Sequence, residues 1–157
     1  MTFSPEQLSL LCRNFCEEMQ AITHESDQFL AQFHTEERVR FSDVAKIKAR
    51  HLEPYSRLLT SLLASLEKSD ALALRLSALL ASADCPDAVE HMPRIEALFS
   101  AYEQYRAQVS EYLAQTQRYW TDKDAMGASG TAPLVQATRT LIGAQRQALA
   151  AFSQGSQ

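Results

Sequence analysis

The sequence predicts an all-α fold: an elongated antiparallel bundle of three to four main helices with a flexibly linked C-terminal amphipathic helix. Two observations carry this prediction. The first glycine of the 157-residue chain is Gly127, whereas tight hairpins and phosphate-binding loops need glycine where the backbone bends or approaches a ligand. Upstream of it, apolar side chains recur at the seven-residue spacing of helices that pack side by side.

The first helix is predicted to run from about Pro5 to Phe33. Ser4 can cap its free amides, Pro5 suits the first turn, and Gln7 can complete a capping box. Its apolar positions form two rows with seven-residue spacing: Leu8, Phe15, Ile22 and Phe29, and then Cys12, Met19, Ser26 and Phe33. This heptad pattern predicts a long helix that packs nearly parallel to another helix.

A second helix is predicted to begin at Ser42 or Asp43. Its apolar stripe is wider than that of the first helix, so we expect it to face two neighbours. The stripe comprises Val44, Ile47, Leu52, Tyr55, Leu58, Leu59, Leu62, Leu63 and Leu66. Pro54 lies inside this helix and removes one backbone hydrogen bond, which predicts a kink near Arg50.

Two further helices are predicted between residues 69 and 121. A leucine-rich segment at 69–83 is either a separate short helix or fused to the preceding one, and residues 84–87 are predicted to form a turn. Pro93 is predicted to lie in the first turn of a long helix that reaches about Thr121. Its two heptad rows are Ile95, Tyr102, Val109 and Thr116, and Leu98, Tyr105, Tyr112 and Tyr119.

The chain is predicted to divide into a helical bundle domain at 1–121, a flexible linker at 122–132 and a C-terminal amphipathic helix with a frayed end at 133–157. The last helix contains no acidic residue. Its apolar residues are Leu134, Leu141, Ile142, Leu149 and Phe152. Such a helix either completes the bundle or takes part in binding a partner's helix, and the sequence leaves both alternatives open.

Composition and charge exclude several classes of function. The net charge of −4 argues against nucleic acid as the main partner, because a protein needs a surplus of lysine and arginine to neutralise the phosphates. The glutamates interleaved with the tyrosines of the 93–121 helix favour a core role for those tyrosines over base stacking. No apolar run approaches membrane-spanning length, and the first residues do not resemble a signal peptide. With three cysteines, an odd number, these features predict a reduced, cytoplasmic protein without membrane insertion.

No motif for catalysis or metal binding is found in the sequence. Cys12 and Cys16 can share one helix face, but no further ligands accompany them, so we expect a core pair. The sequence lacks a Walker loop and the GxSxG, HExxH and ExxH motifs. The four histidines have no mutual helical spacing, and their roles are left open: His24, His34, His51 and His91. We therefore expect neither enzymatic activity nor a metal or cofactor.

Three segments carry a resemblance to a known family. The second-helix residues Val44, Ile47, Pro54, Tyr55 and Leu58 look like that family's second-helix pattern. Residues 104–120 look like its long third helix, and residues 126–131 are similar to the short glycine-containing segment that ends its ordered core. In this layout the chain resembles the FlgN family of flagellar export chaperones.

The resemblance implies a cytoplasmic export chaperone. Such a chaperone binds the C-terminal helical region of the hook–filament junction proteins, keeps them unpolymerised and delivers them to the type III export gate without a cofactor. In the family the C-terminal segment contributes to binding, which by position implies partner-binding roles for Leu134, Leu141, Ile142, Leu149 and Phe152. The alternatives are another secretion chaperone or helical adaptor, a sensory or metal-binding four-helix bundle, and a structural coiled-coil oligomer. The oligomeric state is left open between monomer and dimer.

Overall fold

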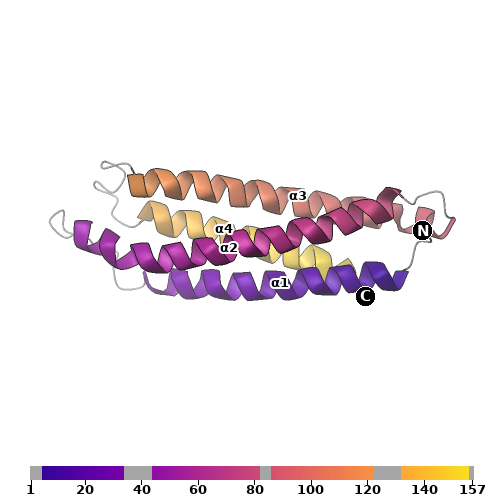
Figure 1. Ribbon diagram of the computed structural model, residues 1–157, viewed down its shortest axis with the longest axis horizontal. Coiled ribbons are helices and arrows are strands. Elements are labelled where there is room, and N and C mark those ends of the chain that lie inside the picture. Colours follow the sequence, from indigo (N-terminus) through magenta and orange to yellow (C-terminus); the bar gives the residue numbers. More distant parts are fainter. Residues whose placement is uncertain (1–4, 34–43, 82–85, 122–131, 156–157) are drawn as a thin grey trace.

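The computed structural model describes residues 5–33, 44–81, 86–121 and 132–155. These residues form four helices (Figure 1): α1 (Pro5–Ala31), α2 (Val44–Ala81), α3 (Pro86–Thr121) and α4 (Ala132–Gly155). The structure confirms the predicted all-α bundle. The predicted linker at 122–132 lies outside the described residues except for its last position, where α4 begins.

The helices lie side by side and alternate in direction along the long axis of the molecule (Figure 1). α1 packs against α2 and α4, and α3 packs against the same two helices. α1 and α3 therefore occupy opposite corners of an up-down-up-down four-helix bundle. This arrangement makes the C-terminal helix a full member of the bundle, because α4 closes the ring between α3 and α1.

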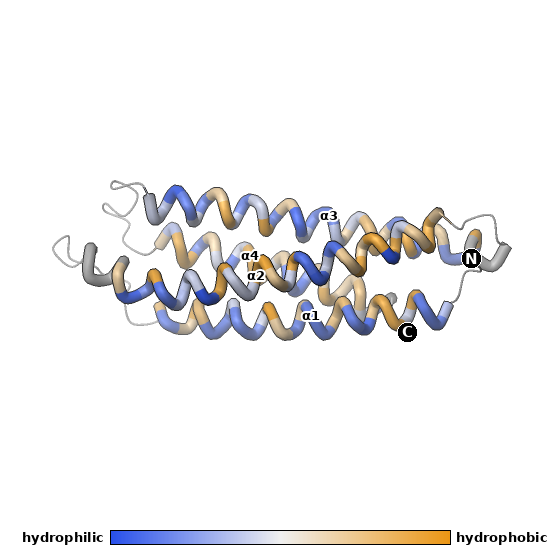
Figure 2. Tube along the Cα trace, in the orientation of Figure 1, coloured by the Kyte–Doolittle hydropathy of each residue, from blue (hydrophilic) through white to orange (hydrophobic). Residues whose placement is uncertain are grey.

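The core is built from the heptad rows that the sequence predicts. Apolar positions recur along each helix (Figure 2), and in α1 and α3 the predicted positions are all buried. In α1 these are Leu8, Cys12, Phe15, Met19, Ile22, Ser26, Phe29 and, just after the helix, Phe33. In α3 they are Ile95, Leu98, Tyr102, Tyr105, Val109, Tyr112, Thr116 and Tyr119. Each large apolar side chain buried in this way contributes roughly 1.5–3 kcal/mol.

One helix boundary differs from the prediction, and one alternative that the sequence left open is now decided. α2 continues without a break to Ala81, so residues 69–81 are fused to the preceding helix, and the helix also runs through Pro54. α3 begins at Pro86 rather than near Pro93, so the prediction of a turn through residues 86 and 87 is wrong. Proline fits the first position of a helix, where its missing N–H has no partner to lose. Pro93 is accommodated inside α3, at the cost of one backbone hydrogen bond.

Hydroxyl groups join α2, α3 and α4 inside the core. Tyr55 Oη lies 2.6 Å from Thr116 Oγ1, and Tyr112 Oη lies 3.2 Å from Thr138 Oγ1. Both threonine hydroxyls donate to a backbone carbonyl of their own helix, at 2.7 Å and 2.8 Å. A hydroxyl carries a single hydrogen, so in each pair the tyrosine is the donor. These paired hydroxyls fix the register of three helices.

A second polar contact joins α4 to α1. Gln145 is fully buried, and its amide Nε2 donates to Ser26 Oγ at 3.2 Å. Ser26 in turn donates to the carbonyl of Ile22 at 2.8 Å. Tyr105 of α3 lies close enough to Gln145 for the amide to influence the pKa of its hydroxyl. α4 is therefore held by specific polar contacts as well as by apolar packing.

We expect the stability of the bundle to fall in alkaline solution. Burial, opposed by Gln145 and assisted by Glu18, raises the pKa of Tyr105 from 10.0 to about 12. The unfolded chain releases this proton near pH 10 and the folded chain near pH 12. The stabilisation is complete below pH 10 and is lost as the pH rises towards 12, by roughly 2–3 kcal/mol. Urea unfolding at pH 8 and pH 11 measures about half of this loss, roughly 1.4 kcal/mol, because pH 11 lies midway between the two pKa values.

Tyr105→Phe is the matched control for this prediction, because it keeps the ring and removes the ionisable group. We expect a smaller loss of unfolding free energy between pH 8 and pH 11 in the variant than in the original chain. Part of the loss remains in the variant, because burial also raises the pKa values of Tyr55 and Tyr112. Equal losses in the two proteins contradict the assigned role of Tyr105.

Candidate helix-binding surface

The structure places the five predicted partner-binding residues of α4 against the bundle. Leu134, Leu141, Ile142 and Phe152 are between 1% and 4% exposed, and Leu149 is half-buried. The Phe152 ring stacks on Phe15 of α1 with its centroid at 3.7 Å. A partner helix reaches these side chains only after α4 leaves the bundle. Their partner-binding role stays a prediction, and their packing role is established by their burial.

The exposed large apolar side chains of the described residues lie mainly on α2. Leu52, Leu63 and Leu74 are 48%, 47% and 74% exposed. They are eleven residues apart, which corresponds to three helical turns, so they form a straight row along the helix. Half-buried Leu59 and Leu66 flank the row. We call this set the leucine surface: Leu52, Leu59, Leu63, Leu66 and Leu74.

The leucine surface adjoins the seam between α2 and α3, which pack less closely than the other neighbouring helix pairs. Asp70 accepts hydrogen bonds from Tyr102 and from Arg106, whose Nε lies 3.2 Å from its Oδ1. Leu63 lies seven residues before Asp70 on α2, and Leu113 lies seven residues after Arg106 on α3. Because the two helices are antiparallel, these equal steps run in the same direction and bring Leu63 beside Leu113. Half-buried Leu113 thus continues the apolar surface from α2 onto α3.

Four charged residues of α2 lie along the flank of the leucine surface that is farther from α3: Glu53, Arg57, Glu67 and Arg75. Glu53 and Arg57 form an exposed ion pair with 4.0 Å between Oε1 and Nε. They line the groove between α2 and α1, which places them on that flank. Glu67 lies fourteen residues after Glu53 and Arg75 eighteen after Arg57, close to whole numbers of helical turns, so they share this flank.

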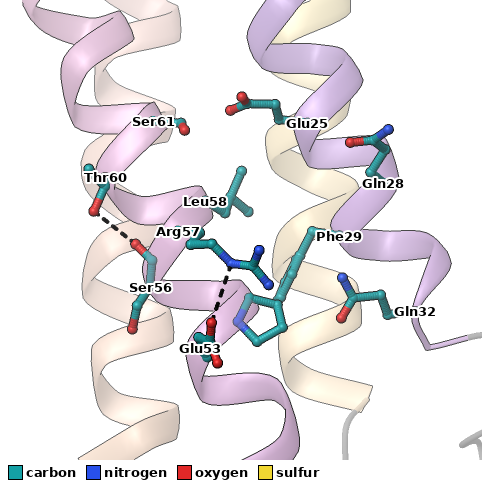
Figure 3. Close-up of a pocket in the computed structure, with 11 residues that line it drawn as sticks. Glu25, Gln28, Phe29, Gln32, Glu53, Ser56, Arg57, Leu58, Thr60 and Ser61 are labelled. Carbon is teal, nitrogen blue, oxygen red and sulfur yellow. Dashed lines mark hydrogen bonds and ion pairs between the residues drawn. The ribbon is translucent and has the colours of Figure 1, made fainter.

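The groove between α1 and α2 has a volume of about 610 Å³, and its lining combines charged and polar side chains with the apolar Phe29, Pro54 and Leu58. Figure 3 shows Glu25, Gln28 and Gln32 of α1 on one side and the Glu53–Arg57 pair of α2 on the other. Thr60 and Ser56 on the same side are joined by a hydrogen bond of 3.0 Å from the Thr60 hydroxyl to the Ser56 carbonyl. The two flanks of α2 therefore differ: the flank towards α1 carries the Glu53–Arg57 pair and hydroxyl groups, and the flank towards α3 carries leucines.

Of the two described cysteines, Cys12 belongs to the core, as the sequence predicts, whereas Cys16 packs against the core from its edge. Cys12 is 1% exposed, and burial raises the pKa of its thiol to about 11, so the thiol stays protonated at neutral pH. Cys16 is half-buried, with its Sγ atom 3.6 Å from Ser153 Oγ of α4. Within the described ranges, no three His, Cys, Asp or Glu side chains gather as metal ligands would.

The histidines lie in unrelated surroundings. His24 is exposed on α1, His91 is half-buried on α3, and His34 lies outside the described residues. His51 is buried in α2, where its ring centroid lies 4.3 Å from that of Phe33. Across residues 5–33, 44–81, 86–121 and 132–155, no helix has the length and apolar character needed to cross a bilayer.

Comparisons with known proteins add no neighbour to this description: no family model, no curated protein and no solved structure matches the chain. Sequence reasoning placed Leu52 and Leu63 in the apolar stripe of the second helix and offered an exposed apolar face around Leu59 and Leu63 as the alternative to the last helix for binding, but it did not find the row that includes Leu74. The available signal was the eleven-residue spacing that these two residues share with Leu74. The spacing places the three leucines on one helix face, but the buried residues His51, Leu62 and Ala73 have the same spacing, so it does not identify that face as exposed.

Proposed function

We propose that this protein is a helix-binding chaperone whose leucine surface receives the apolar face of a client's amphipathic helix. The observation that carries the proposal is the row of exposed leucines on α2, beside the loosest seam of the bundle. A client helix that offers apolar residues at i, i+3, i+4 and i+7 covers such a row along its length. The client's apolar face is then no longer available for polymerisation.

The expected affinity of this surface is moderate. The row from Leu52 to Leu74 spans about 33 Å of helix, enough for roughly six turns of a client. Each leucine that becomes fully buried contributes roughly 1.5–3 kcal/mol, and ordering of the client offsets part of the sum. We therefore expect a dissociation constant on the order of micromolar, with Leu63 at the centre as the main anchor.

The FlgN resemblance suggests the class of client. We propose that the clients are hook–filament junction proteins, bound through their C-terminal helical regions in the cytoplasm and passed to the type III export gate. Another secretion chaperone or a helical adaptor uses the same surface in the same way. The binding step needs no nucleotide or metal, because it relies on apolar contact alone.

A peptide titration tests the proposal. The probes are fluorescent peptides of the C-terminal helical regions of the hook–filament junction proteins encoded in the same genome, titrated with the full chain at nanomolar peptide. We expect saturable binding that Leu63→Asp weakens by about tenfold or more, as the loss of a central anchor does. Leu10→Asp is the matched control, because Leu10 is a 50% exposed leucine on α1, outside the leucine surface.

Three outcomes contradict the proposal in whole or in part. Equal affinities of the Leu63→Asp and Leu10→Asp variants exclude the leucine surface as the client site. Binding that instead requires release of α4, shown by exposure of Leu134 and Leu141 in the complex, transfers the site to the groove that α4 covers. Absence of binding for every peptide removes the assignment of the client class.

A further inference from the structure

The leucine surface is nearly symmetric about its central residue. Leu52 lies eleven residues before Leu63, and Leu74 lies eleven residues after it. The half-buried pair follows the same pattern, because Leu59 lies four residues before Leu63 and Leu66 lies three residues after it. A two-fold axis that passes Leu63 perpendicular to the helix therefore brings Leu52 of one copy to the level of Leu74 of the other. An antiparallel second copy would set leucine against leucine at every position.

The charged flank has the same symmetry with opposite signs. Glu53 lies ten residues before Leu63 and Arg75 twelve after it, while Arg57 lies six before and Glu67 four after. In an antiparallel pair, the two-fold axis keeps the equivalent flanks of the copies on the same side. Glu53 of one copy then faces Arg75 of the other, and Arg57 faces Glu67. Each contact occurs twice, which gives four complementary charge pairs.

A parallel pair lacks this complementarity. An in-register parallel arrangement also matches leucine with leucine, but its two-fold axis runs along the helices. The charged flank of one copy then lies opposite the α3 flank of the other, and the four pairs do not form. Charge complementarity therefore selects the antiparallel arrangement.

We infer that the leucine surface is a self-association surface on which a second copy of this chain lies antiparallel, with Leu63 at the two-fold axis. One helix contact of about 33 Å buries less than a standard interface, so the dimer is weak, with a dissociation constant on the order of micromolar. If the proposed function holds, client and second copy exclude each other, and that consequence alone rests on the proposed function.

Sedimentation equilibrium of the full chain between about 1 and 200 μM tests the inference, because this range brackets a micromolar dissociation constant. We expect a reversible monomer–dimer equilibrium. Leu63→Asp opposes two carboxylates at the axis and should weaken the dimer by about tenfold or more, whereas Leu10→Asp should leave it unchanged. Arg57→Glu should weaken it several-fold by placing like charges together, and the double variant Arg57→Glu/Glu67→Arg should restore it.

Disulfide trapping tests the direction of the copies. We expect Leu63→Cys to form a linked dimer on mild oxidation, with the original chain as the control for its native cysteines. A mixture of Leu52→Cys and Leu74→Cys chains should link with each other, while neither links with itself. Self-linking of Leu52→Cys establishes a parallel pair and overturns the inference, as does a chain that stays monomeric throughout or a Leu63→Asp variant that dimerises normally.

These results separate the two proposals. Client titrations use nanomolar peptide and micromolar chain, so the monomer–dimer equilibrium measured by sedimentation is included when the client dissociation constant is fitted. If the chain binds peptide but never dimerises, the proposed function is retained and the inference of self-association is excluded. If the chain dimerises but binds no peptide, self-association is retained and the proposed client binding is excluded.

Discussion

A chain that ends at Ala132 is expected to lose cooperative unfolding, because it lacks α4. Leu134, Leu141, Ile142 and Phe152 are buried in the structure, and burial of four such side chains contributes roughly 6–12 kcal/mol. That amount is comparable to the whole stability of a typical domain, about 5–15 kcal/mol. The truncation also uncovers Phe15 and leaves Ser26 without the amide of Gln145. Circular dichroism during heating and near-ultraviolet spectra measure the effect.

A chain that ends at Gly155 is the control for this truncation, because it keeps the whole of α4. It should melt like the original protein. A cooperative transition at an unchanged temperature in the shorter chain contradicts the assignment of α4 to the core. That result restores the sequence-based alternative, in which the last helix is an accessory segment kept for a partner.

The same substitution, leucine to aspartate, is expected to change the stability strongly at Leu141 and hardly at all at Leu63. Leu141 is 1% exposed and Leu63 is 47% exposed, although both lie on amphipathic helices. Leu141→Asp places a carboxyl group without a partner in the core and should destabilise the protein by about 4 kcal/mol or more. Leu63→Asp should change the stability by about 0.5 kcal/mol or less, because its side chain remains in water. Urea unfolding at pH 7 measures both values.

This pair of variants also guards against a misleading binding assay. A chain with Asp at both Leu141 and Leu149 loses client binding simply by unfolding, so loss of binding alone assigns no site there. Leu63→Asp combines native stability with lost binding, which is the signature of a surface contact. Comparable destabilisation by Leu63→Asp and Leu141→Asp would falsify the description of Leu63 as a surface residue.

The heptad rows of α1 and α3 could be predicted from the sequence because a seven-residue period directly reports a helix with neighbours on one face. Every predicted row position from Leu8 to Phe33 and from Ile95 to Tyr119 is buried. The core position of Cys12 followed from the same rows, whereas Cys16 lies outside them and is half-buried. Periodicity was therefore sufficient wherever the apolar stripe was narrow.

The sequence could not predict whether an apolar helix face packs inside the bundle or binds another chain. Leu134 and Leu141 show the same amphipathic pattern whether they pack inside the bundle or receive another chain, and the structure places them in the core. On α2 the stripe was too wide for periodicity to separate buried Leu62 from exposed Leu63. The start of α3 was misplaced because Pro86 and Pro93 give the same signal for a first turn.

The central claim, that helices bind on the leucine surface, is tested most directly by leucine methyl NMR of the full chain. Spectra are recorded at a fixed chain concentration during titration with the C-terminal helical peptide of a hook–filament junction protein, and a dilution series without peptide identifies the shifts that come from self-association. The account predicts that the methyl signals of Leu52, Leu63 and Leu74 shift as the peptide binds, while those of Leu134 and Leu141 stay in place. Shifts confined to the leucines of α4 would contradict it.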